Sequence, residues 1–254
     1  MNGNLQELNK FIEIERNRFS MPDHNTFSAC FSNLQRYYTF LLIIIQRYDK
    51  ANGSLADNRR KQKSRIQPLA KAGPRRLTSR ELRLLERGYI LSTAVHLEIE
   101  SFYLFGKILL DRVARALEFY FGQGRSRSLD SHDKLVKNLE DYARIKGLSI
   151  SRELMDSAGK LKQIISNHRD YEIAHAKNAR VIFGTGIDAE DKTTILSLGV
   201  HLDDGEKQIK TKELPELLDE IDTYLTLVIK FIKTNQNKTQ LKTVNSPSQI
   251  QPNQ

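Results

Sequence analysis

The feature that most constrains the fold is a long helix-period pattern in the middle of the chain. Between residues 78 and 121, apolar or small residues recur every three or four positions, at Val95, Ile99, Phe102, Gly106, Leu109, Val113, Leu117 and Tyr120. This spacing places them on one face of an α-helix. Thr78 and Glu81 have the spacing of a capping box, which satisfies backbone amides at a helix start. The sequence therefore predicts a very long helix over residues 78–121, with Gly88 as a point at which it divides.

Other segments repeat this periodicity and predict a mainly α protein. We expect helices at residues 5–19, 26–50, 131–146, 151–175 and 215–233. From Arg180 the pattern changes, and Val181–Phe183 and Thr194–Leu198 read as two short strands. We predict a helical bundle with a small β-hairpin insertion after the helix that carries residues 166–175. The expected parts are N-terminal helices at 1–50, a basic flexible connector at 51–76, a helical core at 77–180, the hairpin and a C-terminal packing helix at 181–234, and a disordered tail at 235–254.

Positive charge is concentrated in the predicted connector. Residues 51–76 contain eight basic residues and one acid, so this segment carries +7 of the net charge of +9. Such a cluster is a candidate electrostatic footprint for nucleic acid, and a solvated linker is the alternative. Pro68, Gly73 and Pro74 argue against a continuous helix across the segment. The predicted nucleic-acid-binding residues are Arg59, Arg60, Lys61, Lys63, Arg65, Arg75 and Arg76.

The densest group of chemically capable side chains follows the predicted helix that begins at Ser151. An arginine, Arg169, is followed by Asp170 and, six residues after the arginine, by His175. Histidine exchanges protons near neutral pH, and the guanidinium fork matches phosphate oxygens. RNA cleavage without a metal needs both functions. Six residues of regular helix turn by about 600°, so the two side chains would point about 120° apart. A site built from them therefore needs a helix irregularity, a partner helix or a second subunit.

Two other interpretations fit the same stretch. Arg169 and Glu172 have the spacing of an ordinary ion pair on a helix surface. His168, Glu172 and His175 lie on one helix face and would suit a metal ion, although no further ligand cluster is evident in the sequence. We expect no metal and no cofactor.

The segment Arg169–His175 resembles the Arg-polar-x4-His motif of the HEPN superfamily of helical, usually dimeric proteins. Residues 106–114 are similar to the long helix that precedes this motif in some HEPN families. The resemblance implies that Arg169 and His175 are catalytic residues of a metal-independent endoribonuclease of the defence or toxin type. Asp170 stands where asparagine is commoner and would support them. Implied partners are RNA, a second copy in a homodimer, and an antitoxin or regulatory protein. The alternative is a non-catalytic HEPN-like module that binds nucleic acid or protein.

Asp111 is a second candidate supporting residue. It interrupts the apolar run Ile108–Ala114, and an acid in such a setting is costly unless it is paired. We expect it to pair with Arg169 or with Arg115, or else to face solvent. His132 falls in the first turn of its predicted helix, and we expect it on the surface.

The cysteine content and the lengths of the apolar runs indicate the cellular compartment. A single cysteine, Cys30, excludes an internal disulfide framework and fits a reducing cytoplasm. No apolar run approaches the length of a membrane span, and the N-terminus lacks the pattern of a secretion signal. We therefore expect a cytoplasmic protein without membrane association.

Overall fold

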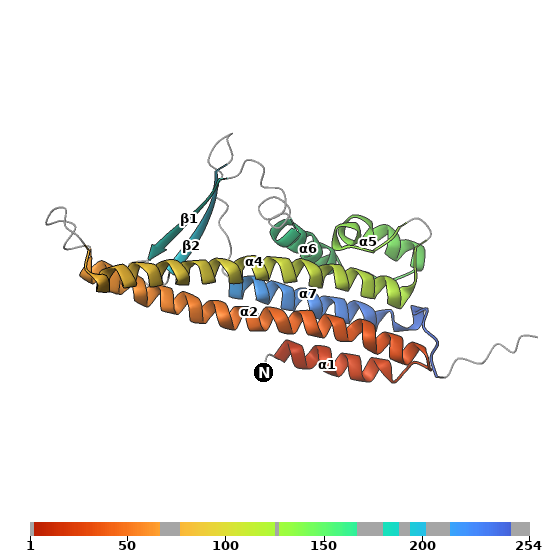
Figure 1. Ribbon diagram of the computed structural model, residues 1–254. Coiled ribbons are helices and arrows are strands. Elements are labelled where there is room, and N and C mark those ends of the chain that lie inside the picture. The colour runs from red at the N-terminus through yellow and green to blue at the C-terminus, as the bar shows by residue number, and fades with distance from the viewer. Residues whose placement is uncertain are drawn as a thin grey trace, which may run out of the picture. The chain divides into compact units, whose positions relative to one another are not determined.

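The computed structural model describes residues 3–66, 77–124, 127–166, 180–187, 194–201 and 214–244. Its main elements are helices, which confirms the predicted mainly helical bundle. They are α1 (Gly3–Arg16), α2 (Asp23–Arg65), α4 (Ser79–Phe121), α5 (His132–Lys146), α6 (Arg152–Leu161), the π-helix η1 (Lys162–Ser166), α7 (Leu214–Thr234) and the short 3₁₀ helix η3 (Gln236–Lys238) (Figure 1).

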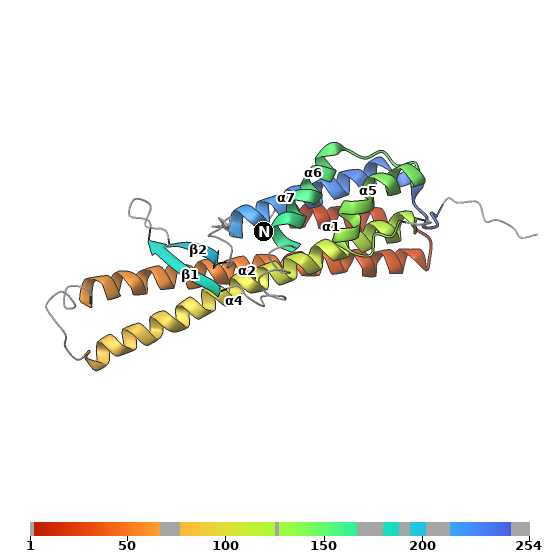
Figure 2. The same cartoon turned by 90° about the horizontal axis from the view of Figure 1, so that it is seen from above.

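The chain divides into two compact units that share α2 and α4. Unit 1 comprises residues 1–40, 105–167 and 218–254, and unit 2 comprises residues 41–104 and 168–217. In unit 1, α1, the first part of α2, the second part of α4 and α7 run side by side (Figures 1 and 2). Phe27 stacks on Phe31 with ring centroids 4.3 Å apart, and Tyr120 of α4 meets Phe27 edge-on. Interlocking aromatic rings of this kind give unit 1 a dense core.

Buried tyrosines tie the helices of unit 1 together. Tyr38 of α2 donates a hydrogen bond to the Asp222 carboxylate of α7, and Tyr120 of α4 donates one to Glu15 of α1. Tyr142 of α5 donates to the Gly122 carbonyl at 2.6 Å. Each phenol thus buries its ring in the core while its hydroxyl keeps a partner, as burial of a polar group requires.

Unit 2 contains an antiparallel helix pair made by the end of α2 and the start of α4. The capping box is present, because the Glu81 carboxylate accepts the Thr78 amide at 2.7 Å and Thr78 Oγ1 accepts the Glu81 amide at 3.4 Å. Gly88 does not divide α4. It lies against α2, where an added Cβ would come within 2.9 Å of the Asn58 side chain. Glycine at this position therefore lets the two helices approach closely.

The other two elements of unit 2 are the strands β1 (Arg180–Ile187) and β2 (Thr194–His201). They pair antiparallel, with Arg180 opposite His201 and Ile187 opposite Thr194. Whether this pair is an insertion attached to the helical bundle stays a prediction.

Two predicted boundaries were wrong. We placed the end of the second helix near Lys50 and a flexible connector after it, but α2 continues to Arg65. Leu55 and Asn58 are buried, so packing overrides the cost of Gly53 in a helix interior. The tail that we expected from Asn235 is ordered as far as residue 244, where the Gln240 amide donates to the Tyr120 carbonyl at 3.0 Å and Leu241 is buried.

Candidate functional site around the π-helix

The three predicted motif residues, Arg169, Asp170 and His175, lie outside the described residues, as do His168 and Glu172 of the alternative metal site. Arg75 and Arg76 of the predicted basic segment also lie outside them. The structure does describe the residues that lead into the motif, the predicted supporting residue Asp111, and the five basic residues at the end of α2. These can be placed in the fold.

The helix that leads to the motif changes its geometry before it gets there. α6 begins at Arg152, capped by the Ser151 hydroxyl as predicted, and changes into the π-helix η1 at Lys162. Ile165 is buried against α4, where a Cβ added at Gly106 would lie 3.3 Å from Ile165 Cδ1. A π-helical turn contains an extra residue and shifts the facing of every later residue, and such turns often occur at functional sites. η1 ends at Ser166, three residues before Arg169, so this irregularity precedes both motif residues and does not change the angle between them.

Charged side chains gather beside η1. Lys107 of α4 is almost fully buried, and its Nζ lies 2.8 Å from Asp133 Oδ2 and 3.3 Å from Asp111 Oδ1. Lys162, the first residue of η1, lies 3.6 Å from Asp133 Oδ1. Burial by itself would raise the pKa of Asp133, but the hydrogen bond and charge of Lys107, aided by Lys162, hold that pKa below its usual value. Asp133 therefore links α4, α5 and η1.

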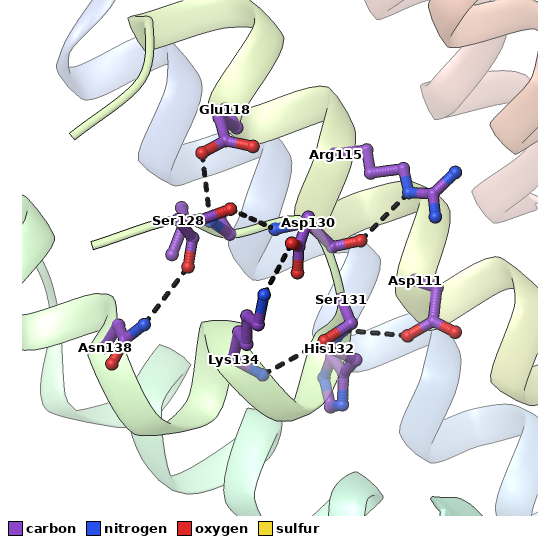
Figure 3. A network of polar contacts seen from close by, with 10 residues as sticks. Asp111, Arg115, Glu118, Ser128, Asp130, Ser131, His132, Lys134 and Asn138 are labelled. Carbon is purple, nitrogen blue, oxygen red and sulfur yellow. Dashed lines mark hydrogen bonds and ion pairs between the residues drawn. The ribbon is translucent and has the colours of Figure 1, made fainter. Parts of the chain in front are cut away.

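Asp111 does not pair with Arg115, which is one of its two predicted partners. Its Oδ1 accepts the backbone amide of His132 at 2.8 Å, which satisfies one of the free amides at the start of α5 (Figure 3). Its ion-pair partner is Lys107. Arg115 instead donates from Nε to the Asp130 carbonyl at 2.9 Å. The expected pair with Arg169 involves a residue outside the described part of the chain.

The rest of this network fixes the loop between α4 and α5. Figure 3 shows Glu118, whose carboxylate accepts the Leu129 amide at 3.1 Å, and Asn138, whose side chain donates to the Ser128 carbonyl at 3.1 Å. The Ser131 hydroxyl caps α5 by accepting the Lys134 amide. These contacts hold the N-terminus of α5 against α4 and keep Asp133 within reach of Lys107.

His132 was wrongly predicted to lie on the surface. Its side chain is fully buried, with its ring edge-on to Tyr224 of α7 at a centroid distance of 5.6 Å. Neither ring nitrogen has a hydrogen-bond partner within the described residues, and the same holds for the buried hydroxyls of Tyr224 and Ser166. Burial, together with the positive charge of Lys107, lowers the pKa of His132 to about 3. His132 is therefore neutral at physiological pH, and the sequence signal that points to its burial is the following run of Leu135 and Leu139 at helical spacing.

A second cationic feature lies at the end of the α2–α4 pair in unit 2. Arg60, Lys61, Lys63 and Arg65 are exposed on α2, whereas Arg59 is half-buried. The opposing start of α4 contributes three further exposed cations that our sequence interpretation missed: Arg80, Arg83 and Arg87. Hydrogen bonds from the Asn58 and Gln62 side chains to the Leu84 carbonyl bring these two helix ends together. Residues 59–65 of the predicted basic segment are therefore part of a folded, two-helix surface.

Two other kinds of reactive site are a nucleophilic cysteine and a metal centre. Burial raises the pKa of the Cys30 thiol to about 11, which disfavours the nucleophilic thiolate. In the described ranges, no three His, Cys, Asp or Glu side chains come together in a way that would hold a metal ion. The helices that the structure describes include none with the length and apolarity needed to cross a membrane.

Comparison with known proteins adds no relative to this description. No protein-family model, no curated protein sequence and no solved structure matches the chain significantly.

Proposed function

We propose that this protein is a HEPN-like, metal-independent endoribonuclease. In this proposal Arg169 stabilises the negative charge that develops on the phosphate, and His175 exchanges the proton of the attacking 2′-hydroxyl. Asp170 supports the pair. The observation that carries the proposal is that the Arg-polar-x4-His segment begins three residues after the end of the π-helix η1, a kind of turn that often occurs at functional sites. A regular helix would separate the two side chains by about 120°, so the proposal takes a second subunit to complete the site.

The electrostatics beside η1 support the proposal. Lys107 and Lys162 both contact Asp133, and the first of them also contacts Asp111. This cluster anchors η1, the last described helical segment before Arg169, and a precisely placed site requires a support of this kind. Asp111 acts in this scheme as a structural residue for α5 and Lys107. Its contribution to catalysis is indirect.

The exposed cations of the α2–α4 end would collect RNA for this site. Seven exposed lysines and arginines on two adjoining helix ends form a surface suited to a phosphate backbone. We further propose that the protein acts in the cytoplasm as a homodimer, that an antitoxin or regulatory protein controls it, and that the β1–β2 pair is an insertion following the motif.

RNA cleavage in EDTA tests this function. Purified wild-type protein is incubated with a labelled RNA beside Arg169→Ala and His175→Ala. Arg144→Ala on the exposed face of α5 and His24→Ala at the start of α2 serve as controls for the same changes elsewhere. We expect cleavage by the wild type and both controls, with products ending in 2′,3′-cyclic phosphate, and a loss of at least 100-fold in the two motif variants. Cleavage that is abolished by EDTA would instead favour metal ligation by His168, Glu172 and His175.

The second candidate is a non-catalytic HEPN-like module that binds nucleic acid. The specific observation in its favour is the exposed cationic end of the α2–α4 pair, which needs no catalytic motif to bind a polyanion. If folded wild-type protein binds RNA but leaves it intact, this function replaces the nuclease.

A further inference from the structure

The part of α4 that belongs to unit 2 is apolar on two opposite faces. One face is buried against α2, with Val95 fully buried and Glu98 paired to Arg47 of α2 at 2.7 Å. The other face is exposed yet also carries large apolar side chains. Its most exposed members are Tyr89 at 76%, Ile90 at 66% and Leu97 at 55%. A surface helix normally places polar residues opposite its buried face, so this second apolar face needs an explanation.

These exposed side chains lie along one stripe of the helix, which Glu86 and Glu100 interrupt. It consists of Leu82, Leu85, Tyr89, Ile90, Leu97 and Leu104, and we call it the α4 stripe. At about 100° per residue, the six positions fall within an arc of about 140°, opposite the face that contacts α2. At about 1.5 Å per residue the stripe extends over about 33 Å, the length of several helical turns. Apolar patches of this extent on a protein surface commonly mark interaction sites.

The border of the stripe is cationic near the start of α4. Arg83 and Arg87 fall about 100–140° from Leu82, between the stripe and the buried face, and Arg80 lies one turn before them. All three are exposed, and none forms an ion pair with another residue in the described portion of the chain. Glu86 and Glu100 are the acids within the stripe itself. The exposed cations of the adjoining α2 end add further positive charge, so the surface is apolar along its centre and positive along one edge.

We propose that the α4 stripe binds an amphipathic helix of a partner protein, whose apolar face covers the stripe and whose acidic residues face Arg83 and Arg87. Leucine and isoleucine side chains at helical spacing complement a helix of the same kind. Bound RNA would not cover these leucine and isoleucine side chains, which would then stay in contact with water. The arginine border adds charge complementarity, which sets the orientation and speeds association. This inference does not rest on RNA cleavage, and Arg83 and Arg87 are shared with the cationic surface proposed above for RNA.

Binding of a designed peptide tests the inference. The probe is a fluorescein-labelled helix with leucine at the a and d positions and glutamate on the flanking positions. The control is a peptide of the same composition in which the leucines are spread around the helix. Fluorescence anisotropy with the full-length protein should show binding of the amphipathic peptide at least tenfold tighter than the control peptide, and the affinity should fall as salt is raised.

Substitutions then locate the site. Ile90→Asp with Leu97→Asp should weaken binding at least tenfold, and so should Arg83→Glu with Arg87→Glu. The matched controls are Ile14→Asp, an exposed apolar residue of α1, and Arg144→Glu on α5, which should leave binding unchanged. Circular dichroism checks the fold, and the milder Tyr89→Ser provides a second variant if the double change unfolds the protein.

Several outcomes would overturn the inference. Equal affinity for the two peptides, or binding that survives both double substitutions, would show that the stripe is not the site. Sedimentation showing a wild-type dimer that becomes a monomer in Ile90→Asp/Leu97→Asp would mean that a second copy covers the stripe. No binding to the wild type would mean that the stripe is unavailable to a partner helix. RNA binding lost on the same double substitution, without peptide binding, would assign the surface to nucleic acid.

Discussion

The burial of His132 makes a specific prediction about stability in mild acid. The imidazole is fully buried against Tyr224, and burial lowers its pKa to about 3. In the unfolded chain the pKa of a histidine is about 6.5. The unfolded state therefore binds the proton more readily, and the free energy of unfolding must fall as the pH drops below about 6.5.

The magnitude follows from the two pKa values. Between pH 8 and pH 5 the histidine should cost the folded state about 2 kcal/mol, and the loss reaches about 4 kcal/mol at pH 3. The assay is urea unfolding at pH 8 and at pH 5 for the wild type and for His132→Phe, which keeps a ring against Tyr224 but cannot titrate. Carboxylates contribute to acid instability in both proteins, so the difference between their pH dependences isolates His132.

We expect the wild type to lose about 2 kcal/mol more than His132→Phe between these pH values. Equal losses in the wild type and His132→Phe would refute the reasoning, because they would mean that the folded protein accommodates the protonated imidazole.

Three further predictions concern the charged cluster, a helix cap and the basic helix ends. Lys107→Met should raise the pKa of Asp133, measured by NMR titration, and destabilise the fold by about 1–3 kcal/mol; an unchanged Asp133 pKa would contradict the pairing. Thr78→Ala should cost about 1 kcal/mol in urea unfolding through loss of the capping box, whereas the exposed Ser79→Ala should cost less. The exposed cations at the end of α2 are Arg60, Lys61, Lys63 and Arg65. Replacing all four with alanine should reduce the slope of log K against log salt concentration, for binding of single-stranded RNA, by about 3. An unaltered slope would mean that RNA binds elsewhere.

Helical periodicity and local capping signals predicted the helices well. α4 begins and ends within a residue of the predicted limits, and α5 ends at the predicted Lys146. Ser131 caps α5, and Gly147, in the left-handed region at a φ of 65°, follows its last residue. These features depend on residues close together in the sequence. The end of α2 was missed because Gly53 and the surrounding charges disfavour a helix locally, while the burial of Leu55 and the hydrogen bond from Asn58 to Leu84 of α4 stabilise one.

The candidate site was less accessible to sequence reasoning for the same reason. The partners of Asp111 are Lys107, one turn earlier, and the amide of His132, twenty-one residues later. The first contact follows ordinary i, i+4 spacing, but the second depends on how α5 folds back on α4. The burial of His132 likewise depends on Tyr224 from α7. Contacts between distant segments of this kind leave no periodic signal in the chain.

The buried tyrosines of unit 1 give the protein an intrinsic optical indicator. The sequence contains no tryptophan, so tyrosine dominates its near-ultraviolet absorbance. Burial and the neighbouring Asp222 raise the pKa of Tyr38, and burial with Glu15 does the same for Tyr120. Burial also raises the pKa values of Tyr142 and Tyr224. Because these phenols ionise far more readily once exposed, at a pKa of about 10, the phenolate spectrum of these four rings in alkali reports loss of the folded state directly.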